Sequence, residues 1–193
     1  MASARTILVF GDSLSAAYGI PPQQGWVALL TQRLESQGYG YRIVNASVSG
    51  ETTSGGRERL PRALQLHQPA IVVLELGGND GLRGLPVEEM RANLAAMVQL
   101  AQAAGARVLL VGMRIPPNYG PRYSEGFARV FPEVASQYHV PLVPFLLQNV
   151  ALDPERMQQD SVHPNARGEP PVLENVWPYL LPLLKKNAQP GGS

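Results

Sequence analysis

The chain has 193 residues, of which 45% are apolar and 16% are charged, and it carries a formal net charge of +1. This balance is typical of one globular domain and excludes both an intrinsically disordered chain and a strongly basic surface, so we expect no nucleic-acid partner. The absence of cysteine excludes a disulfide framework, a thiol nucleophile and a cysteine-ligated zinc site.

Short apolar runs alternate along the chain with longer amphipathic stretches. The apolar runs predict five strands, at Thr6–Phe10, Tyr41–Asn45, Ala70–Leu76, Arg107–Gly112 and Leu142–Phe145. The amphipathic stretches predict helices at Gly25–Gln37, Thr53–His67, Pro86–Ala104, Pro121–Tyr138 and Pro171–Leu184. Repeated β-then-α units predict an α/β fold in which a five-stranded parallel sheet has helices on both faces.

The two ends of the chain add little to this core. We expect one domain over residues 1–186 and a disordered tail over residues 187–193, which end in Gln-Pro-Gly-Gly-Ser. The apolar run Ile7–Phe10 is too short for a signal-peptide core or a membrane span. We therefore expect no stable membrane insertion, and either a cytoplasmic protein or an exported one whose leader is absent from this chain.

Polar, glycine-bearing segments follow the predicted strands. They are Gly11-Asp12-Ser13-Leu14-Ser15, Ala46-Ser47-Val48-Ser49-Gly50, Gly77-Gly78-Asn79-Asp80 and Asp160-Ser161-Val162-His163-Pro164. Ligands of such sheets bind beyond the carboxyl ends of the strands, so these four segments are expected to meet at one site. Taken singly, each segment is more often an ordinary turn or helix cap, and only their combination in order favours a catalytic site.

Ser13 is the candidate nucleophile, and a serine hydroxyl needs a neighbouring base to accept its proton. The chain offers three histidines. His67 and His139 both lead into predicted strands and so lie at the opposite edge of the sheet. His163 alone follows a strand, and Asp160, three residues upstream, is placed to orient its ring. Elimination therefore favours a Ser13, His163 and Asp160 triad.

Acyl transfer also requires hydrogen-bond donors for the oxyanion of the tetrahedral intermediate. The backbone N–H groups of Ser13 and Gly50 are candidates, because a glycine lets the backbone approach a substrate closely. The side-chain amide of Asn79 is the third candidate donor.

These four segments, in this order, resemble the sequence blocks of the SGNH (GDSL) hydrolase superfamily. The phrases Leu74-Glu75-Leu76-Gly77-Gly78-Asn79-Asp80-Gly81-Leu82-Arg83-Gly84 and Met113-Arg114-Ile115-Pro116-Pro117-Asn118-Tyr119-Gly120 are similar to its bacterial thioesterase I, lysophospholipase and arylesterase branch. The resemblance covers nearly the whole chain. It implies a flavodoxin-like α/β/α sandwich, hydrolysis of small-molecule acyl esters and thioesters without metal or organic cofactor, and a periplasmic location. We expect a monomer.

Loop positions beside Asn79 and Met113 suggest an apolar acyl groove. Its candidate lining residues are Leu82, Leu85, Ile115, Pro116 and Tyr119. The alternative is that several of these side chains only pack the loops against one another.

Two segments depart from what the resemblance predicts. Pro21-Pro22-Gln23-Gln24 resembles a small insertion before Gly25-Trp26 that is expected to reshape one wall of the site. Gly168-Glu169-Pro170-Pro171 predicts a late or fractured start of the last helix. The rival functions are a carbohydrate deacetylase or acyltransferase on the same fold, and a non-catalytic lipid- or sugar-binding module.

Overall fold

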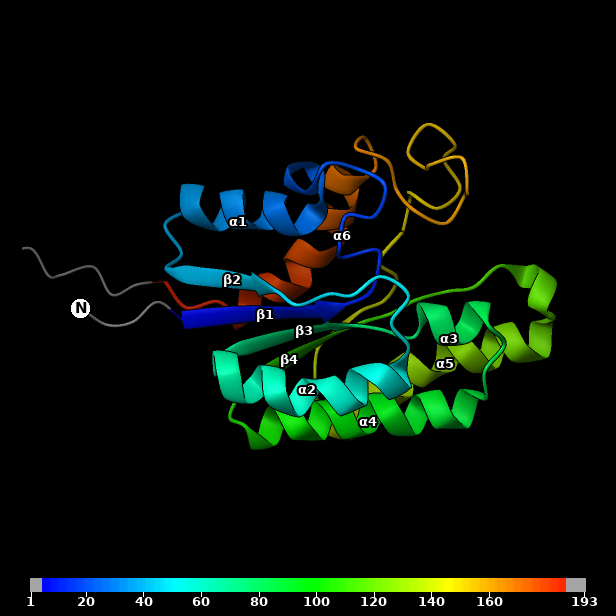
Figure 1. The fold of residues 1–193 in the computed structure, drawn as a ribbon, viewed down its shortest axis with the longest axis horizontal. Helices are drawn as coiled ribbons and strands as arrows, with labels where there is room; N and C mark the ends of the chain where they lie inside the picture. Colours follow the sequence, from blue (N-terminus) through cyan, green and yellow to red (C-terminus); the bar gives the residue numbers. More distant parts are fainter. Residues whose placement is uncertain (1–4, 187–193) are drawn as a thin grey trace, which may run out of the picture.

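The core of the protein is a parallel sheet of five strands in the order β2-β1-β3-β4-β5 (Figure 1). The computed structural model describes residues 5–186. The strands are β1 (Arg5–Gly11), β2 (Tyr41–Asn45), β3 (Ile71–Glu75), β4 (Arg107–Val111) and β5 (Leu142–Val143). The predicted tail at residues 187–193 lies outside the described residues.

Helices cover both faces of the sheet and form the outer layers of a three-layer sandwich (Figure 1). One layer consists of α1 (Trp26–Ser36) and α6 (Glu169–Leu180), which pack against each other. The other layer contains α2 (Thr53–His67), α4 (Val87–Ala103) and α5 (Pro121–Tyr138). The α/β class with a flavodoxin-like parallel sheet, predicted from the sequence, is confirmed.

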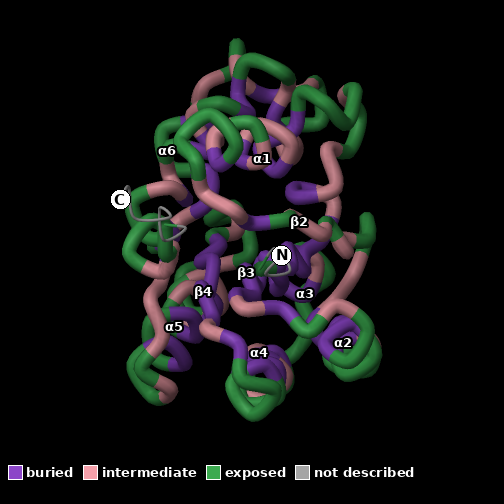
Figure 2. Tube along the Cα trace, turned by 90° about the vertical axis from the view of Figure 1, so that its left-hand side faces the viewer, coloured by how far each residue is buried: buried purple, intermediate pink, exposed green. Residues whose placement is uncertain are grey.

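Burial explains why the strands read as continuous apolar runs. All five residues of β3 are buried, and in β1 only Arg5 at the start is exposed. Figure 2 shows β3 and β4 mostly buried at the centre and the outer helix surfaces exposed, whereas the edge strand β2 is only partly buried. A parallel strand covered by helices on both faces has no solvent-facing side, so polar alternation is absent.

Some elements differ from prediction, and prolines lie at several of these places. β5 ends at Val143 because Pro144 cannot donate a backbone hydrogen bond to a neighbouring strand. Gly78–Leu82, predicted as a loop, forms the short helix α3. Short 3₁₀ turns occur at Pro22–Gln24 (η1), Pro117–Tyr119 (η2) and Leu181–Leu183 (η3).

The last helix starts earlier than predicted, so the expected late or fractured start is wrong. α6 begins at Glu169, two residues before the predicted Pro171, and it ends at Leu180 rather than Leu184. Pro170 and Pro171 occupy its first turn, where a missing N–H is tolerated because that group has no partner within the helix. The buried Glu169 carboxylate accepts the backbone N–H of Trp26 at 2.7 Å and so ties α6 to the start of α1.

Glu169 makes the stability of this joint depend on pH. Burial raises its pKa from 4.5 to about 7, against the opposing hydrogen bond from the Trp26 N–H. Because the pKa is higher in the folded than in the unfolded state, this group's contribution to stability is complete below the unfolded pKa. It is lost as pH rises toward about 7.

A Glu169→Gln variant is expected to lose this pH dependence. As pH rises from about 5 to about 8, the free energy of unfolding of the variant should increase relative to that of the wild type by up to ~3 kcal/mol. Urea unfolding of both proteins at the two pH values measures the change. A difference that does not vary with pH would show that Glu169 is ionised in the folded protein.

Candidate active site

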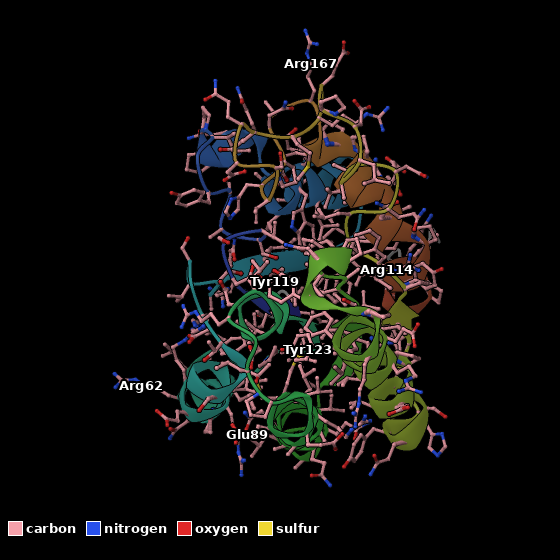
Figure 3. The ribbon with its side chains drawn as sticks, turned by 90° about the vertical axis from the view of Figure 1, so that its right-hand side faces the viewer. Arg62, Glu89, Arg114, Tyr119, Tyr123 and Arg167 are labelled. Carbon is pink, nitrogen blue, oxygen red and sulfur yellow. The ribbon has the colours of Figure 1, made fainter. Side chains whose placement is uncertain are left out.

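The segments that follow the strands meet at one end of the sheet, as the topology requires. Ser13, Gly50, Asn79 and His163 all line one cavity of about 650 Å³ there. Figure 3 looks onto this end of the molecule, the right-hand side of Figure 1, toward which the strands run.

A continuous chain of hydrogen bonds joins three of the predicted residues. Ser13 Oγ lies 2.8 Å from His163 Nε2, and His163 Nδ1 lies 2.6 Å from Asp160 Oδ2. The imidazole therefore bridges a hydroxyl and a carboxylate with its two ring nitrogens. With the Nδ1 proton held by Asp160, Nε2 is left as the acceptor for the Ser13 hydroxyl.

Local backbone bonds hold the carboxylate under the imidazole. Asp160 Oδ1 accepts the N–H groups of Val162 at 2.9 Å and His163 at 3.0 Å. Ser161 adopts a φ of +56°, which gives the tight turn between acid and base. Gln158 anchors this loop to the nucleophile segment, since its Nε2 donates to the carbonyl oxygen of Tyr18 at 2.7 Å.

The same contacts determine the charge of Asp160. Partial burial alone would raise its pKa, but the His163 side chain and the N–H groups of His163 and Val162 outweigh burial and lower it to about 2. Asp160 is therefore ionised at neutral pH and stabilises a positive charge on the neighbouring imidazole.

The turn that carries Ser13 is held by Asp12. Asp12 Oδ1 accepts the Leu14 N–H at 3.0 Å, and its backbone oxygen accepts the N–H groups of Ser15 and Ala16. The Ser13 N–H makes no hydrogen bond in the described part of the chain. This donor is therefore available to a substrate.

Gly50 reaches the cavity through a backbone conformation that favours glycine. Its φ is +79°, within a turn closed by the Glu51 N–H and the Val48 carbonyl at 3.1 Å. The Gly50 N–H has no acceptor among residues 5–186, whereas its carbonyl oxygen accepts from Arg83 at 3.0 Å. The geometry leaves the N–H as a second available donor.

Asn79 is held more tightly than the sequence suggests. Its Nδ2 donates to the Glu51 carbonyl at 2.9 Å and to Asp12 Oδ2 at 3.1 Å. Both partners are acceptors, which fixes the orientation of the amide, and together they use both of its N–H groups. Donation to an oxyanion therefore requires one of these two bonds to be exchanged or shared.

The structure separates the five predicted groove residues into two groups. Leu82, Ile115 and Pro116 line the cavity, whereas Leu85 and Tyr119 do not. The Tyr119 hydroxyl instead donates to the Leu82 carbonyl at 2.6 Å, beside α3 (Figure 3). Tyr119 therefore packs the two loops together, as the alternative in the sequence analysis anticipated.

Several lining residues were not identified from the sequence. Tyr18 lies against the imidazole of His163, with ring centroids 4.6 Å apart. The cavity is also lined by Leu14, Met113, Arg114, Pro117, Phe145, Leu147, Ala151, Leu152 and Met157. None of the four residues Pro21–Gln24 lines it, contrary to the suggestion that this segment shapes a wall.

Metal and membrane features are lacking in the part of the chain that the structure describes. Residues 5–186 contain no group of three or more histidine or acidic side chains placed to hold a metal ion. Within the same residues, no helix has both the length and the apolar character needed to cross a bilayer.

A hydroxyl, an imidazole and a carboxylate in series, beside free backbone donors, define the class of serine hydrolases. Comparison with known proteins agrees with this class, because the model of the GDSL-like Lipase/Acylhydrolase family matches residues 9–169. The chain belongs to this family, and the resemblance to SGNH hydrolases found in the sequence is confirmed.

Individual relatives are similar over nearly their whole length. Esterase TesA of Pseudomonas aeruginosa is 56% identical over 95% of this chain and 91% of its own. Thioesterase 1/protease 1/lysophospholipase L1 of Escherichia coli K12 is 42% identical over 97% of this chain and 88% of its own.

Solved structures give the same result. A crystal structure of TesA superposes with a TM-score of 0.91 at 56% identity, covering 93% of this chain and 100% of the other. The psychrotrophic esterase EstA from Pseudoalteromonas, inhibited by monoethylphosphonate, gives 0.88 at 41% identity, with coverages of 92% and 97%.

Asn79→Ala is expected to reduce kcat severely without abolishing it. Removal of one oxyanion donor typically lowers kcat by about a hundred- to a thousandfold, while the remaining backbone donors keep some transition-state stabilisation. Steady-state hydrolysis of an aryl ester measures the loss. An unchanged kcat would mean that Asn79 serves only to join Asp12 to Glu51.

Leu82 and Leu85 provide a matched pair for testing the groove, because each is 36% exposed but only Leu82 lines the cavity. Burial of each acyl CH₂ in an apolar groove raises kcat/KM by up to about fourfold. Leu82→Asp should flatten the dependence of kcat/KM on acyl chain length, and Leu85→Asp should leave it as in the wild type. Equal profiles for the two variants would contradict the assignment of the groove.

Proposed function

We propose that the protein hydrolyses acyl esters and thioesters through a Ser13, His163 and Asp160 triad and an acyl-enzyme intermediate. The observation that carries this proposal is the unbroken hydrogen-bond chain from Ser13 Oγ through the imidazole to the carboxylate of Asp160. Membership of the acylhydrolase family supports the same chemistry.

In the first half-reaction, Ser13 Oγ attacks the acyl carbonyl while His163 Nε2 accepts its proton. The carbonyl oxygen becomes an oxyanion, to which the N–H groups of Ser13 and Gly50 and the amide of Asn79 donate. The ionised Asp160 stabilises the imidazolium without taking its proton. The imidazolium then protonates the leaving alcohol or thiol, and the acyl group remains on Ser13.

Water completes the cycle through the same groups. His163 accepts a proton from water, the resulting hydroxide attacks the acyl-enzyme, and collapse of the second tetrahedral intermediate returns the proton to Ser13. The carboxylic acid is released, and every step is accounted for by residues of this chain.

The substrate class follows from the cavity and the relatives. Its volume of about 650 Å³ and its mostly apolar lining favour small to medium acyl chains over acetyl groups alone. Relatives named arylesterase and thioesterase 1/lysophospholipase L1 support aryl esters, acyl thioesters and lysophospholipids as candidate substrates. A carbohydrate deacetylase would instead reject all but the shortest chains.

A periplasmic location and a monomeric state remain predictions that rest on the family resemblance. Osmotic-shock fractionation of the source cells tests the first. Sedimentation velocity of the purified protein tests the second.

The direct test is hydrolysis of p-nitrophenyl esters from about C2 to C12 by the wild type and by Ser13→Ala. The substitution should lower kcat by about a thousandfold or more at every chain length, because the nucleophile is lost. The wild-type chain-length profile separates a groove from an acetyl pocket. Comparable rates for both folded proteins would exclude Ser13 as the nucleophile.

A further inference from the structure

A pair of acidic side chains lies behind the candidate active site and takes no part in the proposed proton transfers. Glu75, the last residue of β3, has no exposed surface, and Asp12, next to Ser13, is 2% exposed. Burial of two carboxylates side by side is strongly unfavourable unless one of them is neutral.

The surroundings of Glu75 are built to hold its carboxyl group in place. Its Oε2 accepts the Ser15 hydroxyl at 2.7 Å and the Asp12 N–H at 3.3 Å. A Cβ atom at Gly11 would lie 2.6 Å from this oxygen, so the space for the carboxyl depends on glycine at that position. The nucleophile turn is therefore bonded to Glu75 at two points.

The other oxygen of Glu75 indicates where a proton resides. Oε1 is buried and has no hydrogen-bond partner among the described residues. The Asp12 N–H bonded to Oε2 brings the two carboxyl groups close together, so that a proton on Glu75 can be shared with Asp12. Asp12 Oδ2 in turn accepts from Asn79, which continues the network to the cavity.

The charges around the pair favour one shared proton. Burial is the main cause that raises the pKa of both groups, to about 6 for Asp12 and well above the ordinary value for Glu75, and the charge of Asp12 raises that of Glu75 further. His163 and Asp80 are the other titratable groups whose charges act on Asp12. Arg59 of α2, which lies over the Phe10 ring, is paired with Glu51.

We propose that Glu75 is a positioning residue that carries the single proton of a buried Glu75–Asp12 pair. Asp12 is then the only charged member of the pair, and it orients both the Ser13 turn and the Asn79 amide. A second negative charge behind Asn79 would oppose the oxyanion that the amide must stabilise. Neutral Glu75 therefore supports catalysis through Asp12 and Asn79 without touching the substrate.

The proposal rests on the triad mechanism, so its test compares variants that all retain Ser13, His163 and Asp160. Glu75→Gln keeps the shape and neutrality of the protonated side chain and should retain kcat within about threefold. Glu75→Met is close in shape but makes no hydrogen bond, and should lower kcat by about tenfold or more with KM little changed. Glu169→Gln, at a buried carboxyl that does not line the cavity, is the matched control and should retain kcat.

A second measurement reports on the proton and does not depend on activity. If Glu75 is neutral when folded and ionised when unfolded, wild-type stability falls as pH rises above the unfolded pKa, and Glu75→Gln lacks this loss. The melting temperature of Glu75→Gln should therefore rise relative to the wild type between about pH 5 and pH 8.

Two outcomes would overturn the proposal. One is a Glu75→Gln variant as impaired in kcat as Glu75→Met, and the other is a difference in melting temperature that does not change with pH. If Glu75→Met fails to fold, the two measurements on Glu75→Gln still decide. Ser13→Ala should be inactive whichever result the Glu75 variants give. Failure of this proposal is therefore distinguishable from failure of the triad mechanism.

Discussion

The hydrogen bond of 2.8 Å between Ser13 and His163 is the contact on which the rest of the account depends. The two residues lie 150 positions apart in the chain, so neither local sequence nor helix periodicity can bring them together. The parallel sheet does so, because its strands end at the same edge and their following loops project there. The geometry of the site therefore requires a stable three-layer core.

Buried polar groups link this core to the site. Asp80 accepts both the N–H and the hydroxyl of Thr53, at 2.9 Å and 2.5 Å, and thereby joins the start of α2 to α3. Glu75 and Asp12 make the corresponding connection between β3 and the nucleophile turn. Each such group would cost free energy if left unpaired in the core, so the loops are confined to the positions that satisfy these bonds.

The sequence predicted the features that depend on burial and chain order. Apolar runs located all five strands, and the order of post-strand segments brought Ser13 and His163 to one site. The sequence could not show that Leu82 faces the cavity while Leu85 does not, because that depends on loop geometry. The contact of Tyr18 with His163 likewise depends on a tertiary hydrogen bond, the one that Gln158 donates to the Tyr18 carbonyl. The start of α6 at Glu169 depends on another, the one that the Trp26 N–H donates to Glu169.

Covalent labelling tests most directly whether Ser13 is the activated nucleophile. Intact-mass spectrometry after exposure to a fluorophosphonate, followed by peptide mapping, should find one adduct per chain, on Ser13. His163→Ala should slow labelling greatly, because the base that accepts the serine proton is absent. An unlabelled wild-type protein, or an adduct on another residue, would contradict the account.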